Sequence, residues 1–96
     1  MHDRELYQQK MHAQLDEWKA EADRLRAKAS GASADAQLDI NRQIRALERK
    51  IEAGRAKLLE IASASEDAWE SIKEGVESAW DSLRSATRDA ATKFKK

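Results

Sequence analysis

The stretch AWESIK at residues 68–73 returns eleven residues later as AWDSLR at residues 79–84, and a weaker third copy, AATKFK, follows at residues 90–95. Eleven residues make about three turns of an α-helix, so successive copies are rotated by only about 20° around its axis. Each copy therefore returns its aromatic or aliphatic residues to the same face. The repeat predicts a long amphipathic helix that packs through this face.

The eleven-residue spacing continues upstream of the repeat. Apolar residues at steps of three and four form one stripe from about residue 7 to residue 61, which is typical of helix packing with little supercoil. We expect a core and interaction seam made of Met11, Leu15, Trp18, Leu25, Leu47, Leu58, Trp69, Ile72, Trp80, Leu83 and Phe94.

Helix breakers are scarce, because the chain has no Pro and only three Gly among its 96 residues. The sequence therefore predicts an all-α fold, and it shows no boundary that would divide residues 1–96 into two domains. The clearest interruption is at residues 62–66. Ser63 with Glu66 fits a capping box, and Ser65 is an alternative N-cap for a helix that starts with two acids.

A second candidate break is SGAS at residues 30–33, where Ser33 is a plausible N-cap. Against a break, the apolar stripe keeps its phase through this Ala-rich segment. Two architectures follow. A long antiparallel helical hairpin, or coiled coil, with helices at about 3–62 and 65–94 is the favoured one. A three-helix bundle with an extra break near 30–33 is the alternative.

The chain has few residues of the types that usually catalyse reactions or bind metals. The chain has no Cys and two His, and neither His lies in a motif that would make it a catalytic base. His12 and Asp16 share a helix face, but a zinc site needs three or four ligands. The three glycines are isolated, which excludes a phosphate-binding loop. We therefore predict a protein that is not an enzyme and uses no cofactor or metal.

The formal net charge is zero, with 18 basic and 18 acidic residues interleaved along most of the chain. This pattern provides no continuous basic stripe, and we expect no binding to nucleic acid. No apolar run has the length of a membrane span, and the polar N-terminus does not fit a secretory signal. The expected location is the cytoplasm.

Two kinds of partner fit an amphipathic helical chain. Many of its apolar residues are Ala, so the core is small, and this favours self-association into a homo-oligomer or binding to a partner helix. The alternative is peripheral binding to a lipid surface through the repeat helix at 65–96, with its indoles on one face. The six acids within residues 66–81 weigh against binding to anionic lipid.

The segments LYQQKMHAQLDEWKAE at residues 6–21 and DAWESIKEGVESAWDSL at residues 67–83 resemble a family of small bacterial coiled-coil proteins. The similarity also includes the basic, Phe-containing end at residues 93–96. Members of this family are usually labelled hypothetical or stress-response proteins. The resemblance implies an all-helical bacterial protein induced under stress, with a structural or interaction role and no catalytic residues.

Overall fold

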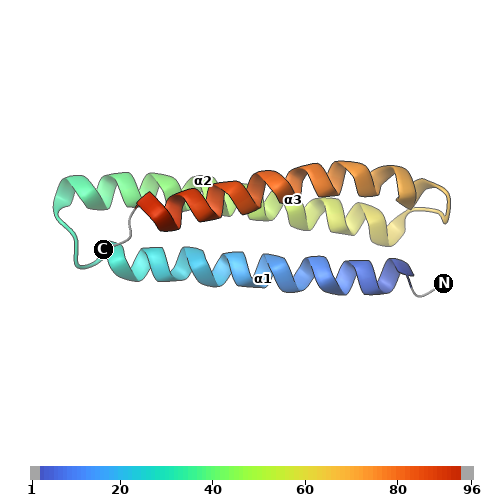
Figure 1. Cartoon of the computed structure of the whole chain (residues 1–96), viewed down its shortest axis with the longest axis horizontal. Coiled ribbons are helices and arrows are strands. Elements are labelled where there is room, and N and C mark those ends of the chain that lie inside the picture. The colour runs from blue at the N-terminus through green and yellow to red at the C-terminus, as the bar shows by residue number, and fades with distance from the viewer. Residues whose placement is uncertain (1–2, 94–96) are drawn as a thin grey trace.

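The computed structural model describes residues 3–93 and contains three helices: α1 (Asp3–Ala29), α2 (Ala34–Ser63) and α3 (Ala68–Lys93). They form an elongated up-down-up bundle of 51 × 18 × 17 Å (Figure 1). Helix α2 runs antiparallel to both neighbours, so α1 and α3 are parallel and have their N-termini at the same end. The all-α prediction is confirmed.

Of the two predicted architectures, the structure has the three-helix bundle. The continuous helix over residues 3–62 is wrong, because α1 ends at Ala29 and α2 begins at Ala34. An unbroken helix would leave the apolar face of residues 3–30 in water. Folding back instead buries Leu25 and Ala29 against α2 and α3.

The turn between α1 and α2 is built by its own small and polar residues. The Gly31 N–H donates to the Lys28 carbonyl at 3.1 Å, which tightens the end of α1. Ser33 has an extended backbone conformation, and its hydroxyl accepts the N–H of Ala36 at 3.3 Å. Ser33 is therefore the N-cap that the sequence predicted at this break.

The turn between α2 and α3 lies at the predicted place. The Ser65 hydroxyl accepts the N–H of Ala68 at 3.2 Å, so the prediction of Ser65 as an N-cap is confirmed. The capping box that starts at Ser63 is wrong. The Ser63 hydroxyl points back along its own helix and donates to the Leu59 carbonyl at 3.2 Å.

The apolar residues that the three helices bury form two clusters along the bundle. The larger one lies in the half that contains the N-termini of α1 and α3, and it contains all the buried indoles. Its members are Met11, Leu15, Ile51, Leu58, Ile61, Trp69, Val76, Trp80 and Leu83. The smaller cluster, at the opposite end, consists of Leu25, Ala29, Ile40, Ile44, Leu47 and Ala90.

Gly54 provides the space that the largest core side chain needs. It is buried on α2, and a Cβ atom added there would lie 3.0 Å from Cζ3 of Trp80 and 3.3 Å from Cδ2 of Leu15. The Trp80 indole therefore packs directly on the α2 backbone. In the sequence Gly54 is an isolated glycine within a helix, and no local pattern there indicates this role.

We expect alanine substitutions at two helical glycines to have opposite effects. Gly75→Ala is expected to raise the free energy of unfolding by about 0.5–1 kcal/mol, because Ala favours the helix and its Cβ meets open space. Gly54→Ala gains the same propensity but overpacks the Trp80 indole, which typically costs about 1–3 kcal/mol, and we expect a net loss. Urea denaturation of the two variants measures both values. Equal stabilisation by both would contradict the close packing at Gly54.

Candidate functional site

The structure brings most of the predicted seam residues into the interior of the bundle. Trp18 and Ile72 are half-buried and pack against the larger cluster, and Phe94 lies outside the described residues. The other seam residues are buried: Met11, Leu15, Leu25, Leu47, Leu58, Trp69, Trp80 and Leu83. Most of the seam is thus the intramolecular core of the bundle, and only the edges of some of its side chains reach the surface.

A groove runs along the boundary between the two parallel helices, α1 and α3. Four hollows of about 240–430 Å³ follow one another along it, and each is lined by residues from both helices. Its floor includes the indoles of Trp18, Trp69 and Trp80. We call this feature the α1–α3 groove.

Buried polar atoms of the described chain that lack a hydrogen-bond partner all lie along this groove. Within residues 3–93 they are the hydroxyl oxygens of Tyr7 and Thr87, Oε1 of Gln14 and Nε1 of Trp80. All four side chains belong to α1 or α3 and line one of the hollows. A buried polar atom without a partner is costly, typically about 1–3 kcal/mol. These four side chains beside the groove therefore have hydrogen-bonding capacity that the fold itself does not use.

One end of the groove is built from aromatic rings and cations. Tyr7 and Trp69 lie 6.1 Å apart between ring centroids, and Nζ of Lys73 lies 5.2 Å from the Tyr7 ring. The Arg4 guanidinium lies 5.8 Å from the Trp69 ring and donates to the Ala64 carbonyl at 2.8 Å. It therefore stabilises the end of α2 and the turn that follows. No sequence motif singled out Arg4, because its partners are about 60 residues away.

The ionisation of the Tyr7 hydroxyl can be measured directly by absorbance, because Tyr7 is the chain's single Tyr. Burial, and then the nearby Glu77 carboxylate, raise the pKa of Tyr7 to about 12. Both effects disfavour the phenolate in the folded chain. The stability that the neutral Tyr7 hydroxyl contributes is therefore fully present below pH ~10 and is lost as the pH rises to about 12. We expect tyrosinate absorbance to titrate near pH 12 in the folded chain and near 10 in denaturant. A folded-state midpoint near 10, with helicity retained, would contradict the buried hydroxyl.

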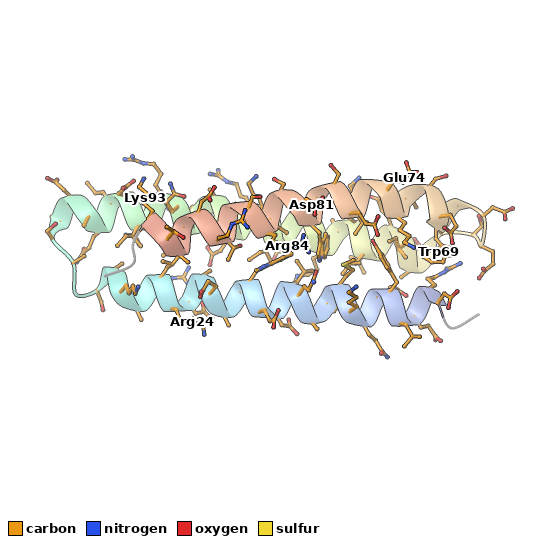
Figure 2. All side chains as sticks on the ribbon, viewed as in Figure 1. Arg24, Trp69, Glu74, Asp81, Arg84 and Lys93 are labelled. Carbon is orange, nitrogen blue, oxygen red and sulfur yellow. The ribbon has the colours of Figure 1, made fainter. Side chains whose placement is uncertain are left out.

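Charge is distributed unevenly along the groove. Figure 2 shows the Glu74 carboxylate toward the Trp69 end of α3 and Asp81 beside Arg84 near the middle of the helix. Lys93, at the second end of α3, pairs with Asp39 of α2 at 3.3 Å. Arg24 of α1 lies toward this second end as well. Because α1 and α3 are parallel, their basic C-terminal segments reach the same end of the bundle. The Trp69 end of the groove is lined by acids and lysines in equal number, Asp3 and Glu70 with Lys10 and Lys73. The other end is mainly basic, with Arg24, Lys28 and Arg88 beside Glu21.

Local ion pairs moderate this separation of charge. Arg24 pairs with Glu21 at 2.9 Å, and Arg84 pairs with Asp81 at 2.8 Å, each within its own helix. The Arg84–Asp81 pair is solvent-exposed and the Arg24–Glu21 pair is exposed on its Arg24 side, so both contribute little to stability. They hold the charged groups along the walls of the groove without filling it.

Other kinds of site find no support in the part of the chain that is described. Within residues 3–93 no three side chains of the His, Cys, Asp or Glu type gather as a metal site would require. No helix in this range combines the length and the apolar character that crossing a membrane demands. His12 lies exposed on α1.

Comparison with known proteins gives no identification. No protein-family model matches the sequence, and neither a curated protein nor a solved structure matches it. The resemblance to small bacterial coiled-coil proteins therefore stays an expectation from the sequence.

Proposed function

We propose that this chain is a non-enzymatic, cytoplasmic interaction protein of bacteria that binds a partner helix, or associates with itself, through the α1–α3 groove. A role in a stress response belongs to the same proposal and rests on the sequence resemblance. A parallel pair of helices with a groove between them fits a third helix from another chain, which is a recurrent mode of helix recognition.

The observation that carries the proposal is the position of the four buried polar atoms without partners described above. All four atoms belong to side chains of α1 or α3 that line the hollows of the groove. A helix laid along the groove would offer donors and acceptors to these side chains as they turn toward it. The aromatic floor would supply apolar contact area.

The lipid-surface alternative now has a structural obstacle. It requires the indoles of α3 to enter the membrane interface, but Trp69 is 5% exposed and Trp80 is 1% exposed. To present them, α3 would have to leave the bundle and expose the larger cluster. The folded chain favours a protein partner over a lipid surface.

The absence of Cys allows a single photo-crosslinking probe to be placed at a chosen position. Glu17→Cys puts a benzophenone label in the groove, and Ala56→Cys puts the same label on the exposed face of α2 as a matched control. We expect irradiation to yield adducts to an identified helical segment, in the source lysate or in a second copy, from the groove label only.

Three results of this experiment would contradict the proposal. Equal yields from the two labels would mean that the groove is no preferred site. The absence of adducts with any helical segment would mean that it takes no helix. Adducts to phosphatidylglycerol vesicles from the groove label, without protein adducts, would favour the lipid alternative.

A further inference from the structure

We infer that the groove's partner is a second copy of this chain, packed face to face and antiparallel across a two-fold axis that crosses α1 and α3 near their middles. This inference rests on the proposed function and names its partner. In such a dimer α1 lies against α1 and α3 against α3 of the partner copy, each pair running in opposite directions.

The charges on α3 are arranged for this pairing. Glu70 and Arg88, two exposed residues that line opposite ends of the groove, lie at equal distances on either side of Ala79. Exposed Glu74 and Arg84 also lie symmetrically about Ala79. A two-fold axis at this level brings each carboxylate opposite a guanidinium of the partner copy.

The charges on α1 show the same arrangement about a point between Leu15 and Asp16. Lys10 and Glu21, which both line the groove, are related by this point. Asp3 and Lys28, near the two ends of the helix, are related in the same way. Opposite charges therefore meet along both helices in the antiparallel dimer, whereas a parallel arrangement would bring like charges together.

The centre of charge symmetry on α1 and the one on α3 lie at nearly the same height in the bundle. Tyr7 packs on Trp69 and Trp18 packs on Trp80, so each residue of α1 is level with the residue 62 positions later on α3. The α1 centre therefore corresponds to a point within about two residues of Ala79, or about 3 Å along the helix. One axis serves both helices.

The same axis relates an exposed apolar side chain to an apolar hollow. Leu6 is 60% exposed at one end of the groove. Its symmetry-related position is Leu25, which forms, with Ala91, the apolar floor of the 430 Å³ hollow at the other end. Leu6 of each copy would enter the hollow of the other.

Near the axis, Glu77 and Asp81 of the two copies approach each other. The Arg84 guanidinium, 2.8 Å from the Asp81 carboxylate within its own helix, offsets part of this repulsion. Because the matched charges are solvent-exposed, each adds little, and salt screens them. We therefore expect a dimer that forms at high protein concentration and weakens as ionic strength rises.

A charge swap tests both the partner and its orientation. Sedimentation equilibrium of the full chain at low salt measures the dimer dissociation constant. Arg88→Glu and Glu70→Arg, each alone, are expected to raise it about tenfold, because each places like charges together twice in the dimer. The double variant restores the opposite-charge contacts and is expected to return within about threefold of the original value.

Arg49→Glu, an exposed charge reversal on α2, is the control and should leave the dissociation constant unchanged. Helicity and melting temperature confirm that each variant is folded. A chain that stays monomeric at millimolar concentration, a dimer insensitive to Arg88→Glu, or a double variant without rescue would overturn the inference. If the groove label at residue 17 still crosslinks to a helix of another protein, the proposed function stands and only the self-pairing fails.

Discussion

Replacing Trp80 with Ala is expected to lower the free energy of unfolding by about 3–5 kcal/mol and the melting temperature by more than about 10 °C. Trp80 is 1% exposed, and its ring lies 6.0 Å from that of Trp18. It also fills, together with Leu15, the space above Gly54. Removing the indole leaves a cavity that three rigid helices close only in part. Circular dichroism during thermal and urea unfolding measures the loss.

A stability of about 5–15 kcal/mol is typical of small domains, so Trp80→Ala alone leaves little margin. Trp80→Phe keeps part of the ring and keeps the effect measurable if the alanine variant is unfolded. The tight approach to Gly54 also predicts coupling. Gly54→Ala should cost less in the Trp80→Phe background than in the original chain, because the smaller ring relieves the close contact. A cost of less than about 1 kcal/mol for Trp80→Ala would show that the indole is not a core side chain.

The eleven-residue repeat predicted the interior of α3 because its physical basis is local. A side chain that returns every third turn lies on one face of a helix whatever that helix packs against. Trp69, Trp80 and Leu83 are accordingly buried, as the spacing indicates. Ser65 was predicted as a cap for the same reason, since its hydroxyl bonds an N–H only three residues later.

The break near residue 31 was harder to predict because it depends on a balance between distant parts of the chain. The apolar phase runs through Ala29, Ala32 and Ala36, but alanine is small enough to continue a stripe without defining one. The turn forms because folding back allows α2 and α3 to bury the apolar face of α1. That gain exists only in the folded bundle. The local signals are limited to the unfavourable helix propensities of Ser30 and Gly31 and the N-cap at Ser33.

The groove could not be predicted from the sequence for a related reason. Gln14 and Thr87 look like ordinary polar residues of solvated helix faces, and only the packing of α1 beside α3 buries them without partners. Gly54 likewise gains its role from an indole 26 positions away on another helix. The charge symmetry about Ala79 was visible in the sequence, but it has meaning only after α1 and α3 are known to be parallel.

Leu58 and Leu59 are adjacent on α2, and we expect their alanine substitutions to have very different effects on the free energy of unfolding. Leu58 is 1% exposed within the larger cluster, whereas Leu59 is 69% exposed on the outer face. Leu58→Ala is expected to lower the free energy of unfolding by about 2–5 kcal/mol, and Leu59→Ala to change it by less than about 0.5 kcal/mol. Both substitutions alter helix propensity equally, so urea denaturation isolates burial as the cause.

Repeating the comparison of Leu58→Ala and Leu59→Ala at low and high protein concentration also tests which face of the bundle self-associates. Measured in dilute solution, a large loss for Leu59→Ala would contradict the placement of the outer face of α2 in solvent. Measured again at high concentration, the two values should keep their difference, because a dimer formed through the α1–α3 groove leaves α2 on the outside. If the cost of Leu59→Ala rose with concentration, the chains would be associating through α2 instead. The pair therefore tests the helix register and the side of the bundle from which a partner approaches.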